Sequence, residues 1–129
     1  MAEFVCGDFV NDSRVYSQIY DYAYSRFTLH AITTLQQNEL LTNIKHVLRP
    51  DGKFFIEART IRDDIYGKGE NVGDNAFIYN GHYRRFVDPD ALADLMSGIG
   101  YKIISLSEGR GFSATQESDP VLMRLVAGA

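Results

Sequence analysis

One stretch of the chain constrains its fold more than any other, because a helix pattern, a sharp stop and an apolar run follow one another in it. Thr33 or Thr34 can cap a helix that runs to about Val47. Apolar residues recur on one stripe of this helix, at Leu40, Leu41, Ile44, Val47 and Leu48. The segment Arg49-Pro50-Asp51-Gly52 ends it, since proline cannot continue a helix and Asp-Gly supplies a turn. Residues 53–58 then form a nearly continuous apolar run, which is typical of a strand covered on both faces.

Other apolar segments predict more strands and a second helix. We expect strands over residues 3–6, about 20–25, about 101–107 and 121–126. Asp88-Pro89 opens the second helix, and Gly98 and Gly100 close it. Strands that alternate with helices predict a mainly parallel α/β sheet. The last two strands are joined only by a loop, so that pair should be antiparallel.

Two glycine-rich segments are not part of this alternation of strands and helices. Residues 60–80 are polar and contain Gly67, Gly69 and Gly73, so we expect a loop that is unusually long unless it is functional. Residues 109–114 match G-x-G-x-x-A, but a dinucleotide site also needs a helix that opens from this loop. Asp119-Pro120 and a strand follow too soon for such a helix, so we reject that interpretation.

Composition excludes several classes of protein. The 129 residues fit one domain, and 45% hydrophobic residues argue against a disordered chain. A formal net charge of −4 disfavours a nonspecific nucleic-acid binder, which needs a basic surplus. Cys6 is the one cysteine, too few for a disulfide or a zinc site, so we expect no metal and a reducing compartment. No apolar run spans a bilayer and no signal peptide opens the chain, so we expect a cytoplasmic protein without membrane contact.

Basic and polar side chains gather where the predicted strands end. They are Ser25, Arg26 and His30 after the second strand, Glu57 and Arg59 after the third, and His82, Arg84 and Arg85 before the second helix. Ligands of open parallel sheets bind beyond the carboxyl ends of the strands, so these arginines predict an anionic ligand. The alternative is that Glu57 pairs with one or more of the arginines and only fastens the loop. Asp8, just past the first strand, could accept a bond from an amino group such as that of adenine, or could simply be a turn residue.

The order of these pieces resembles the latter half to two-thirds of a class I S-adenosylmethionine-dependent methyltransferase. Residues 4–9 (FVCGDF) resemble the end of that family's third strand, where an aspartate meets the adenine of the cofactor. Residues 20–32 resemble its fourth strand and the following loop. Residues 48–57 are similar to its helix end, L-x-P-x-G turn and fifth strand. Residues 96–107 resemble the helix that ends in glycine before the sixth strand, and the terminal strand is like the antiparallel seventh.

The resemblance implies a single truncated methyltransferase-like domain over residues 1–129. Its α/β fold would be a partial Rossmann-like sheet, mainly parallel with an antiparallel C-terminal strand. It implies S-adenosylmethionine as cofactor and methyl transfer to a small anionic acceptor. The cofactor-binding residues would be Asp8, Phe9 and Ser25. The catalytic residues would be Arg26 and His30, with His30 as the base if one is needed. The substrate-binding residues would be Arg59, His82, Arg84 and Arg85.

The chain departs from that family at its start. The family holds its cofactor with a glycine-rich loop after the first strand and an acidic residue after the second, and neither is present here. In the family's sheet these two strands separate the third from the fourth, so the fourth strand would have an unpaired edge. Such an edge invites pairing with another chain. We therefore expect either that the strand over residues 3–6 is repositioned or that a homodimer or a partner chain joins through this edge. A non-catalytic binding or assembly module that has lost cofactor chemistry is the alternative function.

Overall fold

The computed structural model describes residues 20–26, 33–111 and 119–129. Its elements, in chain order, are β1 (Tyr20–Arg26), α1 (Thr34–Val47), β2 (Leu48–Arg59), β3 (Glu70–Gly73), β4 (Ala76–Tyr79), β5 (His82–Arg85), α2 (Pro89–Ile99), β6 (Lys102–Gly109) and β7 (Leu122–Gly128). The strand expected over residues 3–6, together with Asp8, Phe9 and His30, lies outside the described residues.

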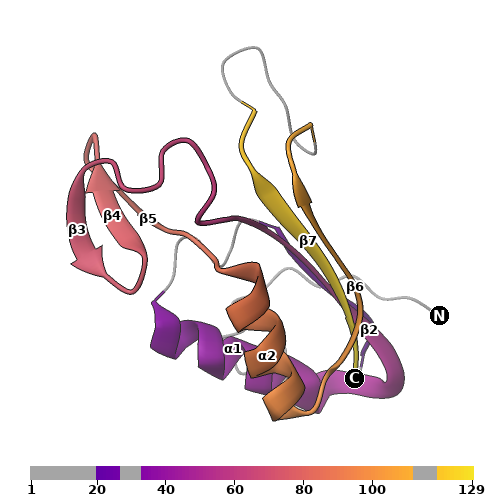
Figure 1. Ribbon diagram of the computed structural model, residues 1–129. Coiled ribbons are helices and arrows are strands. Elements are labelled where there is room, and N and C mark those ends of the chain that lie inside the picture. The colour runs from indigo at the N-terminus through magenta and orange to yellow at the C-terminus, as the bar shows by residue number, and fades with distance from the viewer. Residues whose placement is uncertain (1–19, 27–32, 112–118) are drawn as a thin grey trace.

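The larger sheet has the strand order β1-β2-β7-β6 (Figure 1). Strands β1 and β2 are parallel, and β7 is antiparallel to both β2 and β6. It follows that β1, β2 and β6 run in one direction and β7 runs in the other. The α/β sheet that is mainly parallel, with an antiparallel C-terminal strand, is therefore confirmed.

Both helices begin at the residues that the sequence indicated. Thr33 caps α1 in a reciprocal pair, because its Oγ1 accepts from Gln36 N at 3.2 Å and its own N–H donates to Gln36 Oε1 at 3.0 Å. Asp88 caps α2, with proline at the first helical position. Gly100 closes α2 in the left-handed conformation with φ of 118°, which residues other than glycine rarely adopt.

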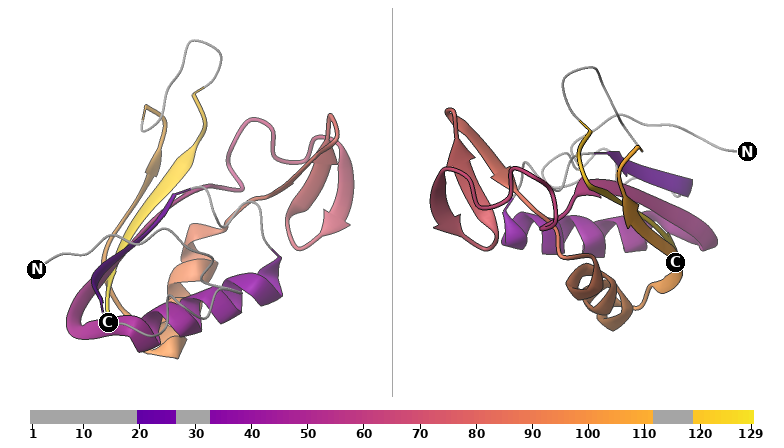
Figure 2. Two further views of the ribbon diagram at one scale, coloured as in Figure 1. Left: turned by 180° about the vertical axis from the view of Figure 1, so that it is seen from behind. Right: turned by 45° about the horizontal axis from the view of Figure 1, so that its top comes forward.

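The core lies between the larger sheet and the two helices, which cover the same face of it (Figure 2). Fully buried side chains there include Leu41, Phe54 and Met96. The opposite face carries Tyr22 and Tyr24 from β1, which are 45% and 61% exposed. Along β2, by contrast, every residue from 53 to 58 is buried or half-buried, so the expectation that this strand is covered on both faces is confirmed.

A second, antiparallel sheet of order β3-β4-β5 forms within the glycine-rich segment. The expectation of a loop over residues 60–80 is therefore wrong for its second half. The strands are only four residues long, and two-residue turns join them, Asp74-Asn75 and Asn80-Gly81. All four turn residues have positive φ, as in the hairpin turns that match strand twist. This arm of the molecule stands beside the helix ends rather than on the larger sheet (Figure 1).

Candidate functional site

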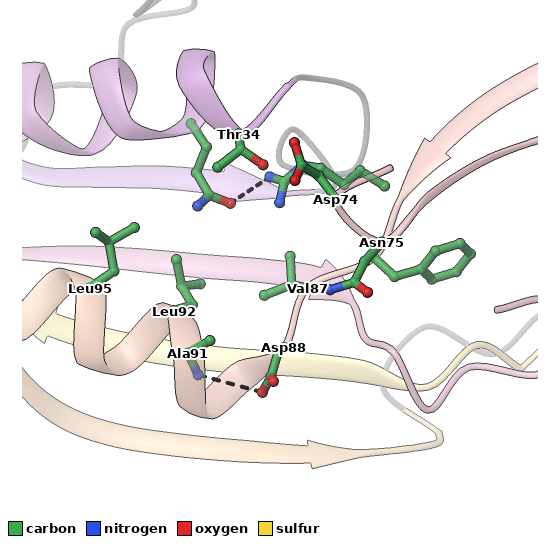
Figure 3. Close-up of a pocket in the computed structure, with 11 residues that line it drawn as sticks. Thr34, Asp74, Asn75, Val87, Asp88, Ala91, Leu92 and Leu95 are labelled. Atoms are coloured by element: carbon green, nitrogen blue, oxygen red, sulfur yellow. Dashed lines mark hydrogen bonds between the residues drawn. The ribbon is translucent and has the colours of Figure 1, made fainter. Parts of the chain in front are cut away.

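A pocket of about 230 Å³ opens between the first turns of α1 and α2 and the arm formed by the second sheet (Figure 3). Its lining residues are Thr34, Gln37, Asp74, Asn75, Arg85, Phe86, Val87, Asp88, Ala91, Leu92 and Leu95. Strands β1 and β2 end where both helices begin, so the pocket lies on the carboxyl side of the parallel strands. This is the edge at which open α/β sheets bind their ligands.

Backbone hydrogen bonds around the end of β2 hold the wall of the pocket that lies between the two helices. Val87 N donates to Arg59 O at 2.9 Å, and Ile61 N donates to Val87 O at 3.0 Å. Phe86 N donates to Asn75 O at 3.0 Å, which ties the β3–β4 turn to the same segment. The backbone is thus held on both sides just before α2.

Arg85 is the cation of the pocket, and its side chain is nearly enclosed, with the residue 5% exposed. Its Nη2 donates to Gln37 Oε1 of α1 at 2.5 Å (Figure 3). Burial lowers the pKa of Arg85, and the negative charge of Asp74 opposes that effect. Arginine nevertheless stays protonated at neutral pH, so the pocket contains a permanent positive charge.

Two carboxylates also line the pocket, and each comes from a turn or cap. Asp74 occupies the β3–β4 turn with φ of 53°, a conformation that aspartate tolerates better than most residues. Asp88 caps α2, and its Oδ1 accepts from Asp90 N at 3.2 Å and Ala91 N at 3.4 Å. Leu92 and Leu95 point from α2 toward α1 and give the pocket an apolar wall (Figure 3).

The structure brings only one of the predicted substrate residues, Arg85, into this pocket. Arg84 precedes it on β5, so the two side chains lie on opposite faces of the strand. His82 is exposed at the start of β5, opposite Tyr79. Arg59 ends β2 and its Nη1 binds Asp63 Oδ2 at 3.1 Å. Arg59 and Arg84 therefore do not share this pocket with Arg85.

Glu57 has a partner that the sequence did not indicate. Arg124 Nε of β7 donates to Glu57 Oε2 of β2 at 2.7 Å, and the Glu57 carboxylate is almost fully buried. The two residues are register partners on neighbouring strands. Arg26, which ends β1, is the register partner of Glu57 on the other side. The observed pair thus joins two strands of the sheet, where the sequence had suggested a pair that fastens a loop.

Ser25 lies at the carboxyl end of β1, and the residue is 5% exposed. Its Oγ has no hydrogen-bond partner among the described residues. Leaving a buried hydroxyl without a partner costs free energy. The other two predicted cofactor-binding residues, Asp8 and Phe9, lie outside the described residues.

Sequence reasoning missed most residues of the pocket. Asp88 was predicted only as a helix cap, and Gln37 lay within the first predicted helix with no role assigned to it. The Asn80-Gly81 dipeptide is a strong hairpin signal and could have revealed the arm. Once β5 is known to be a strand, alternation separates Arg84 from Arg85.

Residues 5–106 match a family model described as a methyltransferase domain. The chain belongs to this methyltransferase family. No curated protein matches the sequence significantly. Within the described ranges, no helix of this methyltransferase domain has the length and apolar character needed to cross a membrane. The same ranges hold no group of three or more His, Cys, Asp or Glu that could bind a metal ion.

Several solved structures share the fold. A S-adenosylmethionine-dependent methyltransferase from Methanosarcina mazei has a TM-score of 0.70 at 11% identity, over 84% of this chain and 58% of that one. The glycopeptide N-methyltransferase MtfA has a TM-score of 0.68 at 13% identity, over 97% and 64%. The Burkholderia thailandensis 1,6-didemethyltoxoflavin-N1-methyltransferase has a TM-score of 0.57 at 20% identity, over 84% and 43%. The methyltransferase domain thus spans less than two-thirds of the length of each of these structures.

Proposed function

We propose that this methyltransferase domain takes part in methyl transfer from S-adenosylmethionine to a small acceptor bound between α1 and α2. The observation that carries the proposal is the pocket around Arg85, on the carboxyl side of the parallel strands in a chain of this family. Methyl transfer is an in-line displacement in which positioning supplies most of the rate. A pocket whose wall is held by backbone hydrogen bonds, beside the edge where the cofactor would lie, provides that positioning.

The cofactor would lie at the carboxyl end of β1. The buried Ser25 hydroxyl, which has no partner among the described residues, fits a hydrogen bond to such a molecule. From the resemblance, Asp8 and Phe9 would meet the adenine. When bound, S-adenosylmethionine supplies an electrophilic methyl group. MtfA has been crystallised with S-adenosylmethionine and with S-adenosylhomocysteine, which supports the same ligand here.

The acceptor would place its acidic group on Arg85, because a guanidinium binds a carboxylate or phosphate through charge-assisted bonds. We propose that the other predicted residues, Arg59, His82 and Arg84, attract an acidic acceptor outside the pocket and do not bind it inside the pocket. Arg26 and His30 keep their proposed place nearest the reacting groups, with His30 as the base if the acceptor must lose a proton.

We also propose that another chain pairs with β1, in a reducing compartment such as the cytoplasm. In the described part of the sheet, β1 is an end strand, with β2 on one side only. An end strand offers unpaired backbone groups to a second copy or to a partner that carries the other strands of the fold. Sedimentation of a monomer at micromolar concentration would argue against this pairing.

A non-catalytic binding module is the second candidate function. One observation favours it: every residue that lines the pocket belongs to the described segment between Thr34 and Leu95, so ligand binding there does not require the family's glycine-rich cofactor loop. Calorimetric titration of the chain with S-adenosylhomocysteine separates the two candidates. Binding at micromolar concentration supports the enzyme, and the absence of heat supports the module.

A further inference from the structure

The pocket between α1 and α2 carries charges of both signs. Among the residues that line it, Arg85 is the cation, and Asp74 and Asp88 are the anions. A ligand that is only anionic would meet two carboxylates as well as the guanidinium. A ligand that is only cationic would meet the guanidinium inside the pocket. Neither kind of ligand matches the lining throughout.

The cationic end of the pocket is built into the fold. Arg85 is only 5% exposed, and its guanidinium donates a hydrogen bond to the side-chain oxygen of Gln37 on α1. Its place on β5 is fixed by pairing with Ala76 of β4. A guanidinium held in this way presents a preorganised donor group to an anion, so little conformational entropy is lost on binding.

The anionic side of the pocket retains oxygen atoms that can accept a bond. Asp88 uses Oδ1 for the cap, and no hydrogen bond to its Oδ2 occurs among the described residues. Asp74 makes no ion pair or hydrogen bond with another described side chain, although its charge acts on Arg85 through space. These carboxylates are therefore available to a protonated amine, which donates up to three hydrogen bonds.

We infer that the pocket selects a small zwitterion, with its acidic group on Arg85, its protonated amine toward Asp74 and Asp88, and its apolar stem along Leu92 and Leu95. A volume of about 230 Å³ is below the roughly 300–1,000 Å³ of pockets that hold drug-sized ligands, so the molecule is small. The inference rests on the proposed function in one respect, since it treats this pocket as the acceptor site.

Three probes with the same five-carbon chain test the inference: δ-aminovalerate with both charges, valerate with the acid alone, and pentylamine with the amine alone. Each is titrated into the full chain without cofactor and followed by the amide resonances of the pocket residues. We expect δ-aminovalerate to bind about tenfold more tightly than either singly charged probe. Equal or tighter binding of valerate would overturn the inference, as would equal or tighter binding of pentylamine.

Two conservative variants sharpen this test. Asp88→Asn removes a charge but keeps a good helix cap, and Asp74→Asn keeps a residue that tolerates positive φ. In the double variant, δ-aminovalerate should bind no better than valerate. Asp94→Asn removes one carboxylate charge from the exposed α2 surface outside the pocket and should keep the preference for the zwitterion. If the double variant keeps that preference, the carboxylates do not select the ligand and the inference is wrong.

The outcomes also separate this inference from the proposed function. If the wild-type chain prefers δ-aminovalerate but does not bind S-adenosylhomocysteine, zwitterion selection stands and methyl transfer by this chain does not. If it binds S-adenosylhomocysteine but prefers valerate, the enzyme proposal stands and zwitterion selection fails. Thermal melting of the variants establishes that they are folded, and the comparison of probes on the wild-type chain decides the question without them.

Discussion

Arg85 Nη2 lies 2.5 Å from Gln37 Oε1, and this hydrogen bond joins the last strand of the small sheet to the second turn of α1. The two residues are 48 positions apart in the chain. Each is buried, so each would lack a bond if the other were removed. The pair therefore holds the arm against the helix and keeps a guanidinium in the pocket.

Replacing Gln37 by leucine should destabilise the fold. The substitution removes an oxygen partner from the buried Arg85 guanidinium, and loss of one partner of a buried polar pair costs about 1–3 kcal/mol. Urea unfolding measures the change. Glu39→Gln, on the exposed side of the same helix, is the control, and a free energy of unfolding that falls no further for Gln37→Leu than for this control would contradict the role of the pair.

The same substitution at two glycines should have opposite effects. Gly81 has φ of 77° in the β4–β5 turn and open space around its Cα, so alanine there meets backbone strain alone and should cost about 1–2 kcal/mol. Gly98 lies inside α2, also with open space, and alanine there should stabilise by about 0.5–1 kcal/mol. Thermal or urea unfolding of both variants checks the signs. Stabilisation by Gly81→Ala would show that the turn is not formed.

Stability should fall at alkaline pH because of Tyr101. Burial raises the pKa of Tyr101, and its hydroxyl donates to Leu41 O at 2.6 Å. The unfolded chain then releases this proton at lower pH than the folded chain. The contribution is complete below the unfolded value of about 10 and is lost progressively above it.

Unfolding free energies measured from about pH 8 to about pH 11 test this effect, since that range brackets the ordinary tyrosine value. Tyr101→Phe should lose about 1 kcal/mol at neutral pH with the hydrogen bond and should show a shallower alkaline decline. Tyr24→Phe changes an exposed tyrosine on β1, and its decline should match that of the wild-type chain. Parallel declines for all three proteins would contradict the assignment to Tyr101.

Ser25→Ala should weaken cofactor binding without weakening the fold. In the described structure the Ser25 hydroxyl is buried without a partner, so its removal costs the free protein no hydrogen bond. A bound S-adenosylhomocysteine that accepts or donates there loses one bond, which corresponds to about a three- to tenfold higher Kd. Calorimetry gives the Kd, and Ser97→Ala on exposed α2 is the control. An unchanged Kd would place the ligand away from this hydroxyl.

Local chemistry made the main elements predictable. The Thr33–Gln36 capping box and the Asp88-Pro89 start of α2 act over a few residues, and the structure has each helix there. The turn expected at residues 49–52 is instead part of β2, which begins directly after α1 at Leu48. The arm was missed because its four-residue strands are too short for an apolar pattern and lie in a polar, glycine-rich segment.

The pocket was less predictable, because it depends on contacts between distant segments. Arg85 was a candidate for its place before α2, but its partner Gln37 belongs to another element, and no local pattern connects them. Arg59 was also a candidate, yet it binds Asp63, four residues further on. Charge and chain order indicated which arginines were near the carboxyl edge but not which of them share a pocket.

The most direct test of methyl transfer at this edge is to map two ligands on one amide spectrum of the full chain. S-adenosylhomocysteine should shift the resonances around Ser25 at the end of β1, and δ-aminovalerate should shift those of Gln37, Arg85 and Leu92. The prediction is two neighbouring, distinct groups on the carboxyl side of the sheet. S-adenosylhomocysteine that shifts no residue at this edge, or shifts only the exposed face around Tyr22 and Tyr24, would contradict it.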